Sequence, residues 1–118
     1  MADPSPPTAA LRNTVTPLGG TDPESRIDAD AADALRDVVG DAALVGLGET
    51  SHGARAQFRL KHRLTRLLVE EFGVRAFALE EDLNWVRRID AFVADGVGDV
   101  ESLLVHARIN WPWKTGEL

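Results

Sequence analysis

Two short apolar runs constrain the fold of this chain most strongly. They occupy residues 42–48 and 74–79, and glycine or acidic residues bound them. Apolar runs of this length are typical of strands buried on both faces of a sheet. Residues 54–72 between them carry leucines at the i, i+4, i+7 and i+8 spacing of an amphipathic helix, at Leu60, Leu64, Leu67 and Leu68. The order strand, helix, strand predicts a right-handed βαβ unit with parallel strands.

Three further helices are predicted from the same kind of periodicity. They cover residues 28–39, 83–94 and, more weakly, 100–106. On the helix over 54–72, three arginines lie on a different face from the leucines: Arg59, Arg63 and Arg66. The predicted fold class is therefore α/β, a βαβ unit with parallel strands and flanking helices.

The chain divides into a flexible lead-in and a structured part. Residues 1–25 contain five of the six prolines and predict a flexible N-terminal segment. Residues 26–118 are expected to form an incomplete part of a larger α/β domain, because two parallel strands need neighbours on both sides. Trp111 and Trp113 lie close to the last residue, with no following element to bury them, so we expect a truncated chain.

Composition excludes several classes of function. The chain has no cysteine, so disulfides, thiolate metal sites and cysteine nucleophiles are excluded. A net charge of −6 argues against nucleic acid and anionic membranes as partners. No run approaches the roughly 18 apolar residues of a membrane span, and the N-terminus does not resemble a secretory signal. We expect a soluble, cytoplasmic protein.

Two acidic residues directly follow the predicted strands. Glu49 ends the first strand, Glu80 ends the second, and His52 follows Glu49 by three residues. Sites in open α/β sheets form at the carboxyl ends of strands, and adjacent strands lie about 4.8 Å apart, so the three groups would share one rim. A carboxylate on one imidazole nitrogen fixes the tautomer and makes the other nitrogen more basic. The alternative is that Glu49 caps the next helix and His52 only fills a loop.

Lys61 occupies the inward stripe of the helix over 54–72. A buried lysine needs a partner, and the rim carboxylates are the natural candidates, although its stem can also extend to solvent. His62 is interpreted as a surface residue, and His106 as a residue that favours the C-terminal end of the last helix through the helix dipole. Ser51 lacks the Gly-x-Ser-x-Gly context of a nucleophile and is expected to cap the helix. We predict no metal and no cofactor, because no histidine pair has metal-ligand spacing.

The stretch LVGLGETSHGARAQFRLKHRLTRLLVEEFGVRAFALEED resembles the opening of the erythromycin esterase-like family. The helix containing Trp85 and the segment WPWKTGEL resemble the same family. The resemblance covers residues 42–118, about two thirds of the chain. Its motifs are Gly-Glu-x-x-His-Gly, Leu-Lys-His-Arg, Ala-Leu-Glu and Trp-Pro-Trp, in that order.

The resemblance implies hydrolysis of a carboxylic ester, which in the antibiotic-resistance enzymes of the family is the macrolactone of a macrolide. It implies that His52 is a general base that activates water without a covalent serine intermediate. Glu49, Glu80 and Lys61 match the other site positions, the last being arginine in some esterases. The family also uses a second histidine from its C-terminal half, which His62 and His106 do not match, so we expect the chain to be inactive alone.

The expected partner in full-length relatives is thus a small-molecule ester. Two alternatives remain open at this point. One is a non-catalytic truncated remnant, or an interaction module that pairs an open sheet edge with another chain. The other is a metal-dependent hydrolase that uses the acidic rim.

Overall fold

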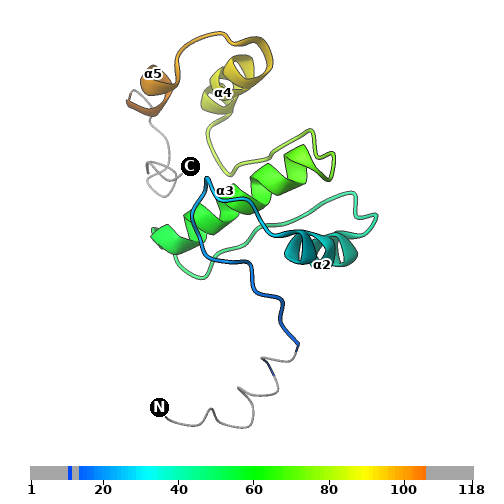
Figure 1. Cartoon of the computed structure of the whole chain (residues 1–118). Coiled ribbons are helices and arrows are strands. Elements are labelled where there is room, and N and C mark those ends of the chain that lie inside the picture. The colour runs from blue at the N-terminus through cyan, green and yellow to red at the C-terminus, as the bar shows by residue number, and fades with distance from the viewer. Residues whose placement is uncertain (1–10, 12–13, 106–118) are drawn as a thin grey trace.

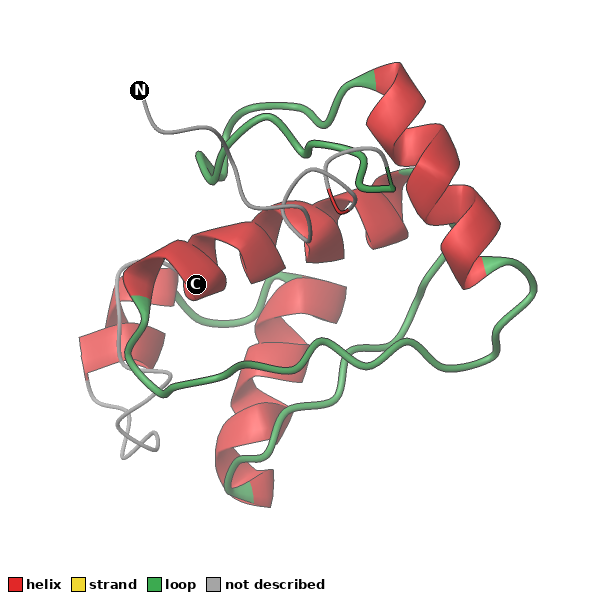
Figure 2. Cartoon of the chain, turned by 90° about the horizontal axis from the view of Figure 1, so that it is seen from below, coloured by secondary structure: helices red, strands yellow, loops and turns green. Residues whose placement is uncertain are grey.

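The computed structural model describes residue 11 and residues 14–105, which form helices joined by loops (Figures 1 and 2). The main elements are α2 (Ala29–Val39), α3 (Arg55–Glu70), α4 (Leu83–Asp95) and α5 (Val100–Val105). In Figure 1, α3 runs through the middle, with α2 near its C-terminal end and the pair α4 and α5 above. The four predicted helices are confirmed to within two residues at each end. The last residue predicted for the fourth, His106, lies outside the described residues.

The α/β fold class is wrong: no strand forms in the part of the chain that the structure describes. Residues 42–48 and 74–79 are loops, and both run back along α3 (Figure 1). Leu44 is 87% exposed and Phe77 is 58% exposed, where a βαβ unit would bury such side chains. The physical reason is that parallel strands need hydrogen-bonding neighbours and apolar cover on both faces, and two segments with one intervening helix supply too little of either.

Helix α3 supplies the largest part of the core. Phe58 is 1% exposed, and Leu67 and Leu68 near its C-terminal end are also buried. Leu67 and Leu68 belong to the predicted leucine stripe, whereas Phe58, nine residues before Leu67, lies on the opposite side of the helix. Among the described helices α3 is the longest, and it lies centrally (Figure 1).

A second, smaller apolar cluster joins α4 and α5. Trp85 and Leu103 are buried against each other, with Ile89 and Phe92 packed at the side. Asp82 caps α4, because its carboxylate accepts hydrogen bonds from the main-chain N–H groups of residues 84 and 85 at 3.0 and 3.3 Å. This cap fixes where α4 begins and therefore how Trp85 enters the cluster.

Residues 18–26, here called the strap, are anchored to α3 by one buried arginine. Arg63 is 3% exposed, although the sequence placed it on a face with the other arginines. Its guanidinium donates hydrogen bonds to four main-chain oxygens, those of Leu18 (2.9 Å), Ser25 (3.0 Å), Arg26 (2.9 Å) and Gly20. Five N–H donors in a fixed fork suit such a set of acceptors.

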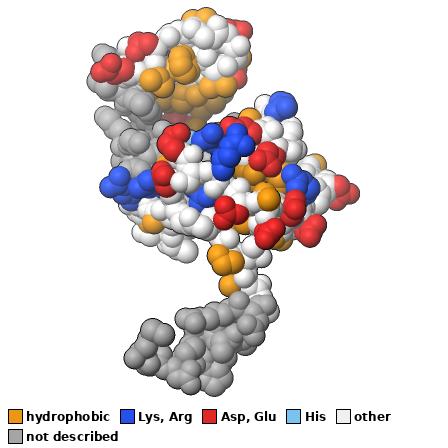
Figure 3. All heavy atoms as spheres, in the orientation of Figure 1, with side chains coloured by type: hydrophobic (Ala, Val, Ile, Leu, Met, Phe, Trp, Pro, Cys, Tyr) orange, Lys and Arg blue, Asp and Glu red, His pale blue; other side chains and the backbone are white. Residues whose placement is uncertain are grey.

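Surface charge and apolar exposure are distributed unevenly. Figure 3 shows acidic and basic side chains interspersed over the central part of the molecule, and apolar side chains gathered over α4 and α5. The exposed apolar residues of that region include Val93, Val97 and Val100. Among residue 11 and residues 14–105, no helix has the length and apolar content needed to cross a membrane.

Candidate functional site

Glu49 brings a histidine and a lysine together. One carboxylate oxygen, Oε1, contacts Nδ1 of His52, and the other, Oε2, accepts a hydrogen bond from Nζ of Lys61 at 2.5 Å. Glu49 ends the loop over 42–49, His52 lies in the turn before α3, and Lys61 lies on α3 itself. These three residues, the Glu49 cluster, thus join a loop, a turn and a helix through one carboxylate.

Lys61 sits on the apolar side of α3, as the stripe indicated. Its side chain is 14% exposed, and its Nζ lies 5.4 Å from the centroid of the buried Phe58 ring. An ammonium group so placed gains from the ring and still needs an anionic partner. Glu49, itself 11% exposed, is that partner. The chemical role of Lys61 stays a prediction.

A turn over residues 50–53 carries His52 from the loop to α3. Gly53 has φ +77°, in the left-handed region that glycine occupies without steric cost. Thr50 is held by Gln57 through two hydrogen bonds: its N–H donates to Oε1 at 3.2 Å, and its Oγ1 accepts from Nε2 at 2.5 Å. Sequence reasoning missed this contact; the available signal was an amide side chain on the same helical stripe as Lys61.

The prediction that Ser51 caps α3 is wrong. The N-cap is Ala54, which offers no side-chain hydrogen bond, and the Ser51 hydroxyl donates to the main-chain oxygen of His52 at 3.3 Å. The alternative in which Glu49 caps α3 also fails, because Glu49 uses its oxygens for His52 and Lys61.

The electrostatics of the cluster fix the direction of the His52 hydrogen bond. The hydrogen bond from Lys61, and next that from His52, hold the pKa of Glu49 below its ordinary value, against the opposing effect of burial. Glu49 is therefore a carboxylate near neutral pH, and a carboxylate only accepts hydrogen bonds. His52 then donates from Nδ1, and in the neutral form of the imidazole the free lone pair is on Nε2. The His52 side chain is 61% exposed, so water reaches the imidazole.

Glu80 lies in a bend before α4, two residues ahead of the cap Asp82, and is exposed. Its expected place beside Glu49 was argued from a sheet edge, and that sheet does not form. Its role in the site stays a prediction. His62, expected at the surface, is half-buried on α3, and His106 lies outside the described residues.

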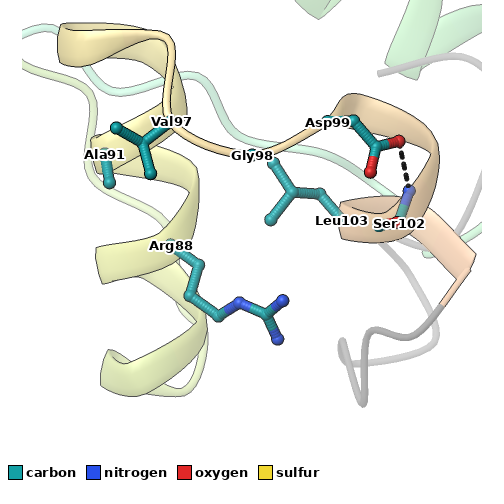
Figure 4. Close-up of a pocket in the computed structure, with 7 residues that line it drawn as sticks. All are labelled: Arg88, Ala91, Val97, Gly98, Asp99, Ser102 and Leu103. Carbon is teal, nitrogen blue, oxygen red and sulfur yellow. Dashed lines mark hydrogen bonds between the residues drawn. The ribbon is translucent and has the colours of Figure 1, made fainter.

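Two cavities of the described residues lie away from the Glu49 cluster. The larger, of about 350 Å³, lies between α4 and α5 (Figure 4). Figure 4 shows the Arg88 side chain extending from α4 towards α5, while on the other side the Asp99 carboxylate accepts a hydrogen bond from the Ser102 N–H at 3.0 Å. Within the described ranges no group of three or more His, Asp and Glu side chains is placed to hold a metal ion.

Comparison with known proteins gives a partial similarity to an enzyme. The chain is similar to erythromycin esterase type II of Escherichia coli, with 44% identity over 46 residues. The matched segment is 39% of this chain and spans 11% of the length of that esterase. No protein-family model matches the chain, and no solved structure matches it. The similarity hints at a relationship to a hydrolase.

Proposed function

We propose that the Glu49 cluster is the general-base part of a site that hydrolyses carboxylic esters. The observation that carries this proposal is the bond between the Glu49 carboxylate and Nδ1 of His52, with Lys61 on the other carboxylate oxygen. A carboxylate–imidazole pair of this kind serves as a proton acceptor in hydrolysis when its second nitrogen reaches water. The partial similarity to an esterase supports the same reaction class.

The proposed reaction has two steps. Nε2 of His52 takes a proton from water as the water oxygen attacks the ester carbonyl, which gives a tetrahedral intermediate. The carbon–oxygen bond to the alcohol part then breaks, and the protonated imidazole returns its proton to the departing alkoxide. Glu49 stabilises the positive charge that His52 carries in between. Lys61 keeps Glu49 ionised and in place, because it donates to the oxygen that His52 does not use.

The proposed substrate class is a carboxylic ester, with a macrolide lactone as the specific candidate. The name of the similar esterase supports this choice. Glu80 is proposed as a further carboxylate of the site. The two cavities described above lie away from the Glu49 cluster, so we propose that the inactivity expected of the chain alone applies to macrolides, and that an activated ester, which needs only the base, is still hydrolysed.

The test uses an activated ester, because 4-nitrophenyl acetate requires base-activated water and no deep cleft. We expect His52→Ala to lower turnover about 100-fold, within the range for loss of a general base. The matched control is His62→Ala, which removes a histidine of α3 outside the cluster and should leave turnover unchanged. Ser51→Ala should also leave it unchanged, because no acyl-serine forms. Equal losses in the two histidine variants would sink the proposal.

Erythromycin provides the second arm of the same experiment. The chain should leave the lactone ring closed, as measured by mass spectrometry, while it still turns over the activated ester. Ring opening by the chain alone would show that the proposed division between base chemistry and substrate binding is wrong.

A further inference from the structure

Two residues of α3 form hydrogen bonds with two consecutive residues that precede His52, namely Glu49 and Thr50. Lys61 binds Glu49, and Gln57 binds Thr50. Gln57 and Lys61 are four residues apart on one helix, so they lie on the same face, one turn from each other. The segment that leads to His52 is therefore bound to α3 at two consecutive residues, Glu49 and Thr50.

The Gln57–Thr50 contact is specific for an amide. The Gln57 oxygen accepts the Thr50 main-chain N–H at 3.2 Å, while its nitrogen donates to the Thr50 hydroxyl at 2.5 Å. A reversed amide would set NH₂ against a main-chain donor, so only one orientation satisfies both groups. A side chain that bonds to backbone and hydroxyl at once fixes both the path of the turn and its rotation.

Without such a contact, the turn over residues 50–53 would have little to fix its conformation. Thr50, Ser51, His52 and Gly53 are all exposed, and Gly53 has φ +77°. The turn leads into the N-cap of α3, Ala54, which has no side chain that could cap the helix with a hydrogen bond. A glycine turn without a side-chain cap has many accessible conformations, and the imidazole meets Glu49 in only a few of them.

We infer that Gln57 is a positioning residue that holds the turn so that the His52 imidazole stays on Glu49. It acts through Thr50 and does not itself touch the reacting atoms. The inference rests on the proposed function only for its effect on ester turnover, since the placement of the imidazole is measured separately.

The experiment follows the His52 ring by long-range ¹H–¹⁵N NMR in the full chain. In the wild type, Nδ1 should carry the proton. Gln57→Met removes both hydrogen bonds at nearly equal length and should shift the imidazole signals towards a mixture of tautomers. Thr50→Val, which replaces only the hydroxyl by a methyl group, should shift them in the same direction, while Thr50→Ser keeps the hydroxyl and should restore the wild-type signals.

Thr65→Val is the matched control, because it makes the same change elsewhere on α3. It should leave the imidazole signals unchanged. Wild-type signals in a folded Gln57→Met chain would overturn the inference; if that variant does not fold, wild-type signals in Thr50→Val would do so.

Kinetics separate this inference from the proposed function. Misplacing the base should lower kcat for 4-nitrophenyl acetate by up to about 100-fold with little change in KM. If the wild type turns over no ester, the proposed function fails, and the NMR signals still decide the role of Gln57.

Discussion

Lys61 and Glu49 meet at 2.5 Å between Nζ and Oε2, and neither side chain is more than 14% exposed. The pair links the last residue of a loop to the middle of the longest described helix. Because the second carboxylate oxygen contacts His52, the lysine acts on the imidazole through Glu49. The pair therefore couples the charge state of the site to the position of α3.

Removing the lysine should change the acidity of Glu49. In Lys61→Met the hydrogen bond that contributes most to the lowered pKa is absent, so the pKa of Glu49 should rise towards its ordinary value. Side-chain carboxylate ¹³C shifts followed against pH measure this. Lys61→Arg is the control and should keep the pKa low, since a cation remains. A pKa of Glu49 that does not move in Lys61→Met would show that the contact has no electrostatic effect.

The contribution of Glu49 to stability should depend on pH in one direction. Its pKa in the folded chain lies below the ordinary value of 4.5, so the folded state binds the proton less readily than the unfolded state. The stabilisation is therefore complete above pH 4.5 and is lost as the pH falls through the lower, folded pKa. Glu49→Gln cannot ionise, so its difference from wild type in free energy of unfolding should be largest above that pH.

Chemical denaturation of both proteins between neutral pH and the acid limit of folding measures this difference. It should shrink steadily on acidification. A difference that stays constant with pH would contradict the assignment of the effect to ionised Glu49.

Arg63→Met should destabilise the chain strongly. It removes a guanidinium that is 3% exposed and leaves four strap carbonyls without their donors. Losing hydrogen bonds to a buried charged donor costs roughly 3 kcal/mol or more. Arg87→Met is the control, because Arg87 is exposed on α4, and its effect should stay within about 0.5 kcal/mol.

Urea denaturation gives both free energies, and hydrogen exchange of the strap amides shows where protection is lost. Equal stability of the two variants would mean that the strap adds nothing to folding.

Two substitutions separate the observed fold from a sheet. Leu44 is 87% exposed, so Leu44→Lys should change the free energy of unfolding by less than about 0.5 kcal/mol. Phe58 is 1% exposed, and Phe58→Ala should cost about 3–5 kcal/mol. Thermal melts followed by circular dichroism rank the two variants. A large loss in Leu44→Lys would indicate that residues 42–48 are buried after all.

The helices were predictable because their signal is local. The leucine spacing of α3 and the acidic cap of α4 act within a few residues, and tertiary contacts did not override them. Strands depend on partners at a distance, and an apolar run such as residues 42–48 does not say whether the rest of a sheet is present. The sequence therefore predicts Leu44 and Phe77 as core residues, whereas both are exposed in the structure.

Only some contacts of the candidate site could be predicted from the sequence. The inward stripe of α3 indicated that Lys61 needs an anionic partner, and Glu49 takes that place. The Thr50–Gln57 contact depends on the shape of a glycine turn, which a residue pattern does not give. The burial of Arg63 could not be read from helical periodicity either, because it depends on a strap far away in the sequence.

Arg63, which anchors the strap, binds only main-chain groups of that segment in the hydrogen bonds described above. Arg63 binds main-chain oxygens, and these are present whatever side chains the strap carries. The ion pairs of Asp22 with Arg59 and of Glu24 with Arg66 also join the strap to α3, but both acids are exposed, so these pairs contribute little. Apart from Gly19 and Gly20, whose φ angles of +71° and +104° favour glycine, the side chains of residues 18–26 can change during evolution as long as the carbonyls keep their path. A change at Arg63 instead removes all four of these hydrogen bonds at once.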